Sequence, residues 1–357
     1  MKKTLLLTTA LIGNLLIGSV QAQTTITGEL KMAYKSVEGF GAGTPSNSGF
    51  TSERQINFAN KGKLNNGLDY AAGFSLEQDG DQDGKGTTSA LNSSIDGGEG
   101  NYFNIISGNT TITLGMDHIL NGDYAIVPRV GAPMNEEIGV IGGTTVARTD
   151  SRAGLQYSQS LGDNNESMGL GVIQTIPSVG RIAVNFVPRS DDTAQTADTA
   201  VPVTAVGKSA YSVFFVGDLG VKGLQVALER AQNEKNGANL TDPKVTAFGA
   251  SYTMGDFSVG AERQKFIDGT KAETETTEFG LTYKINNNAS AGIGRIVTEG
   301  KTAAGASVAN DEEIQYLQIG YNLGGFSTQL SYIDTDNVGF TATNDAKAFV
   351  AKIAARF

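Results

Sequence analysis

A side-chain alternation with a period of two residues recurs along most of this chain, and it constrains the fold more than any other feature. From Ile26 to Lys35 apolar residues and glycine alternate with Thr27, Glu29, Lys31 and further residues on the other face. Alternate side chains of a strand point to opposite faces, so this stretch predicts a strand with one apolar and one polar face. Runs of about ten such residues are typical of strands that cross a membrane within a barrel.

The same pattern returns downstream, with short and long connections in turn. Its apolar positions include Ile56 and Phe58; Leu68, Tyr70, Phe74 and Leu76; Ile112, Leu114 and Met116; Leu224, Val226 and Leu228; Phe257 and Val259; Phe279, Leu281 and Tyr283; Leu317, Ile319 and Tyr321. Tight turns are expected at residues 65–67, 255–256, 286–288 and 324–325, and long polar loops at 189–207, 233–243 and 301–312. An Asn-Gly pair, as in the first turn, is a strong hairpin signal. Short turns on one rim and long loops on the other are typical of outer-membrane barrels.

The number of strands follows from the runs and from the positions of the chain ends. The sequence contains seventeen candidate runs, but termini on one side of a membrane require an even number of strands. The region from Arg152 to Val187 is ambiguous, because residues 153–160, 168–175 and 181–187 compete as strands. Merging the first two gives sixteen strands, and a missed strand would give eighteen. We expect an all-β, transmembrane antiparallel barrel of sixteen strands, with short periplasmic turns and long extracellular loops.

The N-terminus has the features of a secretory signal peptide. Lys2 and Lys3 precede an apolar stretch, and small residues stand at the positions that a signal peptidase reads before Gln23. We therefore expect residues 1–22 to be a signal peptide and residues 23–357 to be one barrel domain. No apolar run after residue 22 approaches the roughly 20 residues of a spanning helix, so a membrane-embedded form requires strands closed into a barrel.

Composition excludes several other classes of protein. Cysteine is absent, which rules out a disulfide scaffold and thiol chemistry. The formal net charge of −10 argues against nucleic acid as a partner, since a phosphate backbone requires a basic surface. No motif indicates a cofactor. The 46 glycines and 7 prolines suit many strands joined by turns, although a secreted soluble β-rich adhesin would have a similar composition.

Three segments resemble the trimeric porin family of Gram-negative bacteria. Residues 54–78, RQINFANKGKLNNGLDYAAGFSLEQ, resemble the family's second strand, turn and third strand, and residues 101–118 resemble its next hairpin. The chain ends in AKAFVAKIAARF, an alternating strand with the terminal aromatic Phe357. The resemblance implies that Phe357 is the signal read by the barrel-assembly machinery. Alanine at position 355, the absence of tryptophan, and Gln55 where the family has a basic wall residue depart from the family pattern.

The resemblance also implies an architecture and a function. The expected protein is a homotrimer of barrels in the outer membrane, in contact with lipid and lipopolysaccharide, through which small hydrophilic solutes diffuse passively. Its third extracellular loop, at about residues 117–150, would fold into the lumen and form a constriction. The candidate constriction residues are His118, Asp123, Glu136 and Glu137.

Charges with the parity of the lumen should set the ion selectivity, because a narrow passage focuses their field on passing ions. The candidates are Glu29, Lys31, Asp69, Glu77, Glu229, Glu262, Glu278, Lys284, Lys352 and Arg356. Six acids outnumber four bases, and the third loop adds acids. The sequence therefore predicts a mild preference for cations.

Two motifs suggest other chemistry. Asp79, Asp81 and Asp83 copy the front half of a calcium loop, but Ala90 stands where the bidentate glutamate should be. An acidic second extracellular loop is the alternative interpretation. His118, the single histidine, allows the hypothesis of an outer-membrane lipase- or protease-like barrel, yet the sequence supplies no nucleophile motif or metal spacing. We therefore expect no catalysis and no confident metal site.

Overall fold

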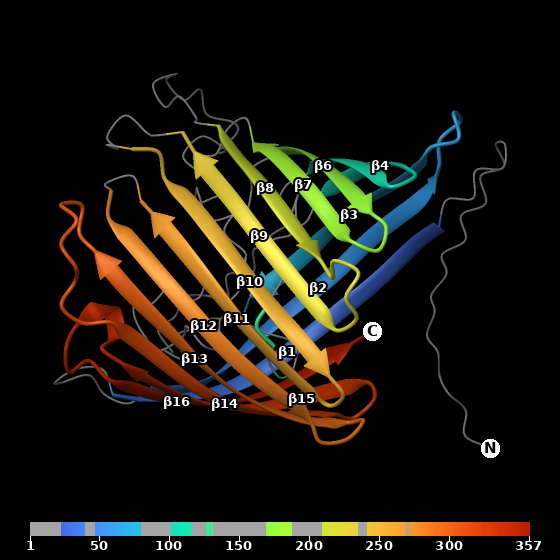
Figure 1. The fold of residues 1–357 in the computed structure, drawn as a ribbon. Helices are drawn as coiled ribbons and strands as arrows, with labels where there is room; N and C mark the ends of the chain where they lie inside the picture. The colour runs from blue at the N-terminus through green and yellow to red at the C-terminus, as the bar shows by residue number, and fades with distance from the viewer. Residues whose placement is uncertain are drawn as a thin grey trace, which may run out of the picture.

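Sixteen antiparallel strands form a closed barrel in the computed structural model of this chain (Figure 1). The structure describes residues 23–39, 47–79, 101–115, 126–128, 130, 169–187, 209–234, 241–268 and 271–357. The elements are β1 (Gln23–Gly39), β2 (Asn47–Lys63), β3 (Asp69–Asp79), β4 (Tyr102–Ser107), β5 (Thr110–Gly115), β6 (Gly169–Ile176), β7 (Gly180–Val187), β8 (Ala210–Gly217), β9 (Leu224–Asn233), β10 (Lys244–Met254), β11 (Phe257–Ile267), β12 (Glu273–Lys284), β13 (Ala289–Lys301), β14 (Glu312–Asn322), β15 (Phe326–Asp336), the short 3-10 turn η2 (Val338–Phe340) and β16 (Ala346–Arg356).

Each strand pairs with its neighbours in the sequence, and β1 pairs with β16 to close the ring. Closure matters because an open sheet edge would leave backbone N–H and C=O groups without partners in lipid. The sequence-based prediction of sixteen strands is confirmed. The ambiguous region contributes β6 and β7, whereas the competing run at residues 153–160 lies outside the described residues.

The two faces of the wall differ as the alternation predicts. Large apolar side chains are exposed on the outside, among them Ile26, Met32, Ile56, Phe74, Leu114, Val184, Leu228, Phe248, Phe279, Ile293, Leu317, Ile319, Leu330 and Ile353. Polar side chains of the opposite parity are buried on the inside, among them Ser75, Thr113, Asn185, Ser212, Gln264, Thr276, Gln318 and Ser331. An apolar exterior of this extent marks a surface that meets lipid or another protein.

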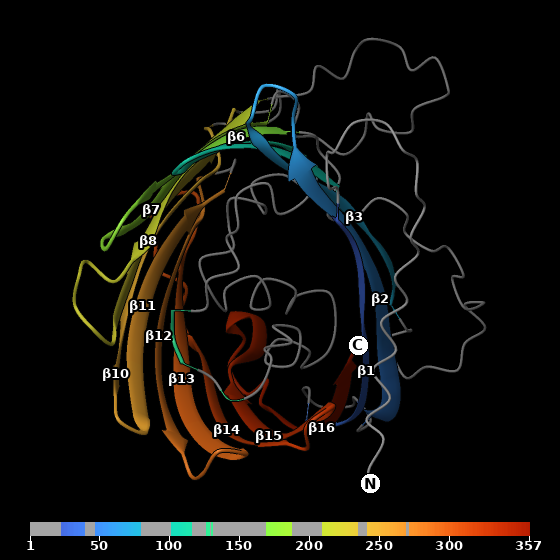
Figure 2. The ribbon, with the colours of Figure 1, turned by 90° about the vertical axis from the view of Figure 1, so that its right-hand side faces the viewer.

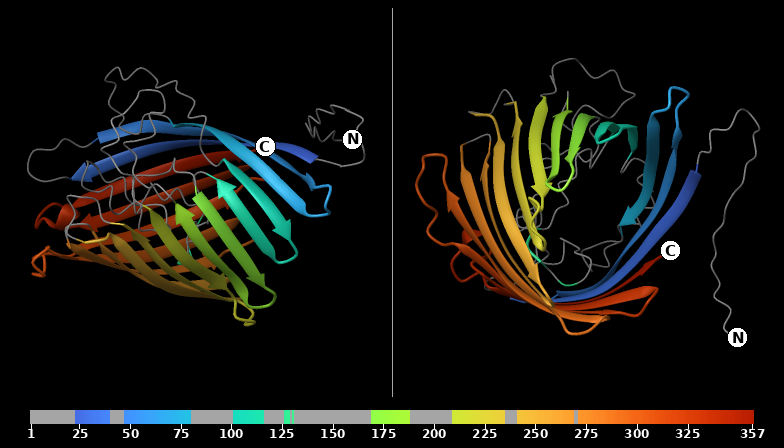
Figure 3. Two further views of the ribbon diagram at one scale, coloured as in Figure 1. Left: turned by 90° about the horizontal axis from the view of Figure 1, so that it is seen from above. Right: turned by 45° about the vertical axis from the view of Figure 1, so that its right-hand side comes forward.

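The rims of the barrel also differ, as predicted. One rim carries short turns, including residues 255–256, 285–288 and 323–325, and the ends of the barrel domain lie there. The other rim carries the longer connections, and the strands run obliquely between the two (Figure 3). No helix among the described residues is both long and apolar enough to cross a membrane.

The last residue of the chain completes the pairing of β1 with β16, which we call the seam. The backbone N–H of Gly28 donates a hydrogen bond of 2.7 Å to the Phe357 carbonyl, and the Phe357 N–H donates one of 3.0 Å to the Gly28 carbonyl. The Phe357 ring covers Gly28 so closely that a Cβ at this position would lie 2.5 Å from ring atom Cε2. Glycine at position 28 therefore leaves the space in which the terminal ring packs.

Candidate functional site: the lumen

Buried carboxylates gather on one side of the inner wall. They belong to Glu229 on β9, Glu262 on β11, Glu278 on β12 and Glu312 on β14. Glu262 and Glu278 are directly opposite each other in the strand register and are only 4% and 2% exposed. Directly opposite side chains in an antiparallel pair lie about 5 Å apart, so this pair concentrates negative charge. The hydroxyl of Tyr316 donates a hydrogen bond of 3.0 Å to Glu278 Oε1.

Lysines with the inner parity lie on β1 and β16. In the ribbon, β1 lies across the ring from β10, β11 and β12 (Figure 2). Lys352 is paired with Ala33 in the register and therefore lies between Lys31 and Lys35 of the neighbouring strand. Closer to the short-turn rim, Glu29 accepts a 3.0 Å hydrogen bond from Arg356 Nε and lies 3.6 Å from Lys31 Nζ. The lumen thus has basic and acidic sides, and the field between them crosses the path of a solute.

A short segment between β5 and β6 lies inside the barrel against β10 to β14. Ile126, Val127, Pro128 and Val130 meet the wall where it has glycine, and all but Pro128 are buried. The glycines are Gly249, Gly260, Gly280, Gly292 and Gly320, one from each of five successive strands. A Cβ would lie 2.6 Å from Ile126 Cγ2 at Gly249, 2.7 Å from Pro128 Cδ at Gly260 and 2.6 Å from Val130 Cγ1 at Gly320.

We call these five glycines the glycine track. They allow the segment to lie closer to the wall than any other residue type would permit. The Val130 N–H also donates a hydrogen bond of 3.2 Å to Gln318 Oε1 on β14. On the other side of the segment, Ile126 and Val127 pack with Phe214, Val216 and further apolar residues of the inner wall.

The connection between β15 and β16 is a second segment that enters the lumen. Val338 of η2 is buried among inward-facing Ile296, Ile314 and Ile333 and other residues of the wall. The Gly339 N–H donates a hydrogen bond of 2.7 Å to Glu312 Oε2. In Figure 2 the red helical turn accordingly lies within the ring of strands. The apolar residues of this element follow neither strand nor helix periodicity, so the sequence does not predict it.

The predicted wall residues lie on the inner parity where their side chains are described. These are Glu29, Lys31, Asp69, Glu229, Glu262, Glu278, Lys284, Lys352 and Arg356. Asp69 forms a 2.6 Å ion pair with Lys63 near the short-turn rim. Glu77 belongs to β3, but its side chain is outside the described part of the chain. Their roles in selectivity remain predictions.

Other predicted residues fall outside the described ranges. These are His118, Asp123, Glu136, Glu137, Asp81 and Asp83, together with the side chain of Asp79. Within the described ranges no group of three or more His, Asp or Glu side chains could hold a metal ion. The calcium hypothesis for residues 79–83 therefore stays a prediction.

Several inner-wall residues were missed as candidates. Lys35 and Glu312 have lumen parity and are 8% and 4% exposed. Parity would have identified Lys35, whereas Glu312 was taken as the end of a loop. The glycine track is also recognisable in the sequence, because glycine recurs at an inward position of five successive alternating runs.

Comparison with known proteins identifies the family. A family profile described as Gram-negative porin matches residues 8–297. The chain belongs to the Gram-negative porin family. No curated protein sequence matches this porin.

Solved structures similar to the porin share its fold at low sequence identity. The anion-selective porin from Comamonas acidovorans is 15% identical, with a TM-score of 0.65 over 94% of this chain and 100% of that chain. Salmonella typhi OmpF in complex with daunomycin is 11% identical, with a TM-score of 0.64 over 94% and 97%. Outer-membrane expressed OmpT of Vibrio cholerae is 12% identical, with a TM-score of 0.59 over 96% and 99%.

Membership of this family and the polar lumen define what the porin does. It lies in the outer membrane of a Gram-negative cell and forms a channel through which small hydrophilic solutes diffuse passively. Its long-loop rim is extracellular and its short-turn rim is periplasmic.

Proposed function

We propose that the porin is a homotrimeric general-diffusion channel with a mild preference for cations and with no catalytic activity. The observation that carries the proposal is the division of the inner wall, with carboxylates on β9, β11 and β12 across the ring from the lysines on β1 and β16. Such a field orients solutes as they pass, and fixed charges in a narrow passage act strongly on ions. No reaction or cofactor is required for this function.

The preference for cations follows from the balance of charge. Among the wall residues predicted from the sequence, six acids stand against four bases, and the chain has a formal net charge of −10. Asp123, Glu136 and Glu137 would add further negative charge in the loop at 117–150. The packing of residues 126–128 and Val130 against the glycine track supports the proposal that the loop narrows the pore.

The exterior near the seam supports self-association. Aromatic side chains of β1 to β4 form contact pairs on the outer face, with ring centroids 5.2 Å apart for Tyr34 and Phe50 and 4.8 Å for Phe58 and Phe74. Phe50 is 77% exposed in the single barrel, which is unusual for so large an apolar side chain. OmpT of Vibrio cholerae has a solved structure described as a trimer form.

The proposal also includes the export of the porin and its assembly in the outer membrane. Residues 1–22 act as the signal peptide, and Phe357 is recognised by the barrel-assembly machinery. The mature barrel contacts outer-membrane lipid and lipopolysaccharide. The packing of Phe357 on Gly28 supports its role, because the terminal residue completes the last strand pair.

Recordings in planar bilayers test the proposal. Purified porin should give ohmic single-channel conductance, and a KCl gradient should give a reversal potential of the sign set by K⁺ permeation. A reversal potential of the opposite sign would overturn the preference for cations. His118→Ala should leave conductance unchanged, and a hydrolytic activity lost in this variant would instead support an enzyme.

A further inference from the structure

A basic surface lies on the outside of the barrel, at the extracellular ends of β9, β10 and β11. On these strands the outward apolar positions reach Leu228 and Phe248, which are 55% and 53% exposed. The outward positions beyond them carry Arg230 on β9, Lys244 on β10, and Arg263 and Lys265 on β11. Among the outward residues of these three strands there is no Asp or Glu. On β9, β10 and β11 the apolar outer surface is therefore followed directly by basic side chains.

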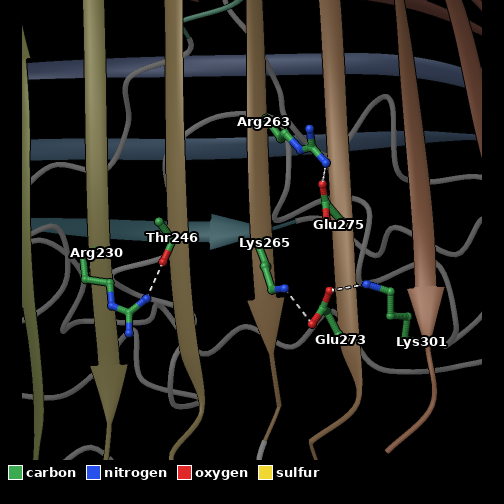
Figure 4. A network of polar contacts seen from close by, with 7 residues as sticks. All are labelled: Arg230, Thr246, Arg263, Lys265, Glu273, Glu275 and Lys301. Carbon is green, nitrogen blue, oxygen red and sulfur yellow. Dashed lines mark hydrogen bonds and ion pairs between the residues drawn. The ribbon is translucent and has the colours of Figure 1, made fainter. Parts of the chain in front are cut away.

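Two of the four cations are neutralised by the next strand. Arg263 is ion-paired with Glu275 of β12, and Lys265 Nζ lies 2.7 Å from Glu273 Oε2 (Figure 4). Glu273 is shared, because Lys301 Nζ of β13 lies 2.8 Å from its other oxygen. Glu273 and Glu275 on β12 thus neutralise the two cations of β11.

Arg230 and Lys244 differ from Arg263 and Lys265 in their contacts. Arg230 donates a hydrogen bond of 2.5 Å to the hydroxyl of Thr246, and in the described part of the chain neither Arg230 nor Lys244 is ion-paired with a carboxylate. Thr246 is paired in the register with Arg230 on one side and Lys265 on the other. Strands are about 5 Å apart, and alternate residues along a strand are about 7 Å apart. The Thr246 hydroxyl therefore lies amid Arg230, Lys244 and Lys265.

We propose that Arg230, Lys244 and Thr246 bind a phosphate group of lipopolysaccharide, that is, of the phosphorylated glycolipid in the outer leaflet. A guanidinium group binds a phosphate through two parallel hydrogen bonds, and an ammonium group and a hydroxyl supply further donors. The site borders the apolar outer surface, so acyl chains of the same lipid would lie against Leu228 and Phe248. This continuity favours a lipid over free phosphate. The inference rests on the outer-membrane placement and lipid contact of the proposed function.

Lipid binding by purified porin tests the proposal. Bisphosphorylated lipid A should raise the melting temperature of the wild-type porin, and its apparent affinity should fall about thirtyfold in R230Q/K244Q, given the contribution of each basic residue near a charged lipid surface. T246V, which keeps the volume and removes the hydroxyl, should weaken binding to a smaller extent. K222Q/K284Q is the matched control, because it makes the same change in charge at the periplasmic rim.

The controls separate the possible outcomes. Dephosphorylated lipid A should bind wild-type and R230Q/K244Q porin equally, since only the phosphate contact is lost. Undiminished binding of lipid A by R230Q/K244Q would overturn the proposal, and so would inorganic phosphate that binds as tightly as lipid A. R230Q/K244Q should keep the wild-type conductance. A defect in conductance of the wild-type protein would contradict the channel function and leave the lipid-binding result intact.

Discussion

At Gly280 the inner wall and the segment 126–130 approach each other with no space for a side chain. A Cβ there would lie 2.9 Å from the Pro128 carbonyl oxygen and in contact with a methyl group of Val127. Overpacking of this kind costs about 1–3 kcal/mol, so Gly280→Val should push the segment off the wall and into the channel. We expect a lower single-channel conductance and a lower melting temperature.

Gly325→Ala is the control for Gly280→Val, because no atom lies within 4 Å of a Cβ at that position. It should leave both quantities at wild-type values. An unchanged conductance in Gly280→Val would mean that the segment can adjust without narrowing the channel.

Lys352 is the central base of the lysine side of the lumen. Replacement by glutamine removes a positive charge opposite the carboxylates and should raise the permeability ratio of cations to anions roughly twofold, because nearby wall charges control local ion concentration. Reversal potentials in a salt gradient measure this ratio. Lys284→Gln, at the exposed end of β12 on the periplasmic rim, should change it much less, and an equal change in both variants would argue against selectivity set at mid-depth.

Individual residues were predictable from the sequence to different degrees. Parity alone placed Lys31, Lys352 and Glu278 on the inner face, because each strand alternates strictly. Parity does not predict register or burial, so it could not show that Glu278 lies directly opposite Glu262 with both side chains almost fully buried. Those properties depend on register between strands and on segments without periodicity.

The final connection of the barrel is a structural element of its own. Val338 buries its side chain in the inner wall, and Asn337, Phe340 and Thr343 all have positive φ. Non-glycine residues in this conformation are costly and persist where the surroundings fix them. Replacement of residues 337–345 by a Gly-Ser turn should therefore widen the lumen and raise the single-channel conductance. A similar replacement of residues 303–306, which are exposed, is the control, and an equal conductance in both variants would show that η2 does not limit flow.

Most strands were predictable at the level of elements. Their alternation indicated seventeen runs, the requirement for an even number reduced these to sixteen, and the tight turns near Gly67, Gly255 and Gly324 were located from turn residues. The shortest strands, β4 to β8, have only six to eight residues, which gives the alternation little room to repeat, and two of them, β6 and β7, lie in the region where the strand count was ambiguous.

We expect the porin to be a trimer, and two substitutions on its outer face test where the subunits meet. Phe50→Ser changes an aromatic residue on the outer face of β2, whereas Phe248→Ser makes the same change on β10, across the ring. If the face near the seam is the interface, only Phe50→Ser should lower the temperature at which the oligomer dissociates on gels. Equal behaviour of both variants would place the interface elsewhere.

The pairing of the first strand with the last has a consequence for biogenesis. The ring can close only when β1 and β16 are both present, because each strand supplies the partner that the edge of the other requires. Before closure both edges are unpaired, a state that is prone to aggregation. A premature stop codon even one strand early would therefore abolish the pore rather than produce a smaller one.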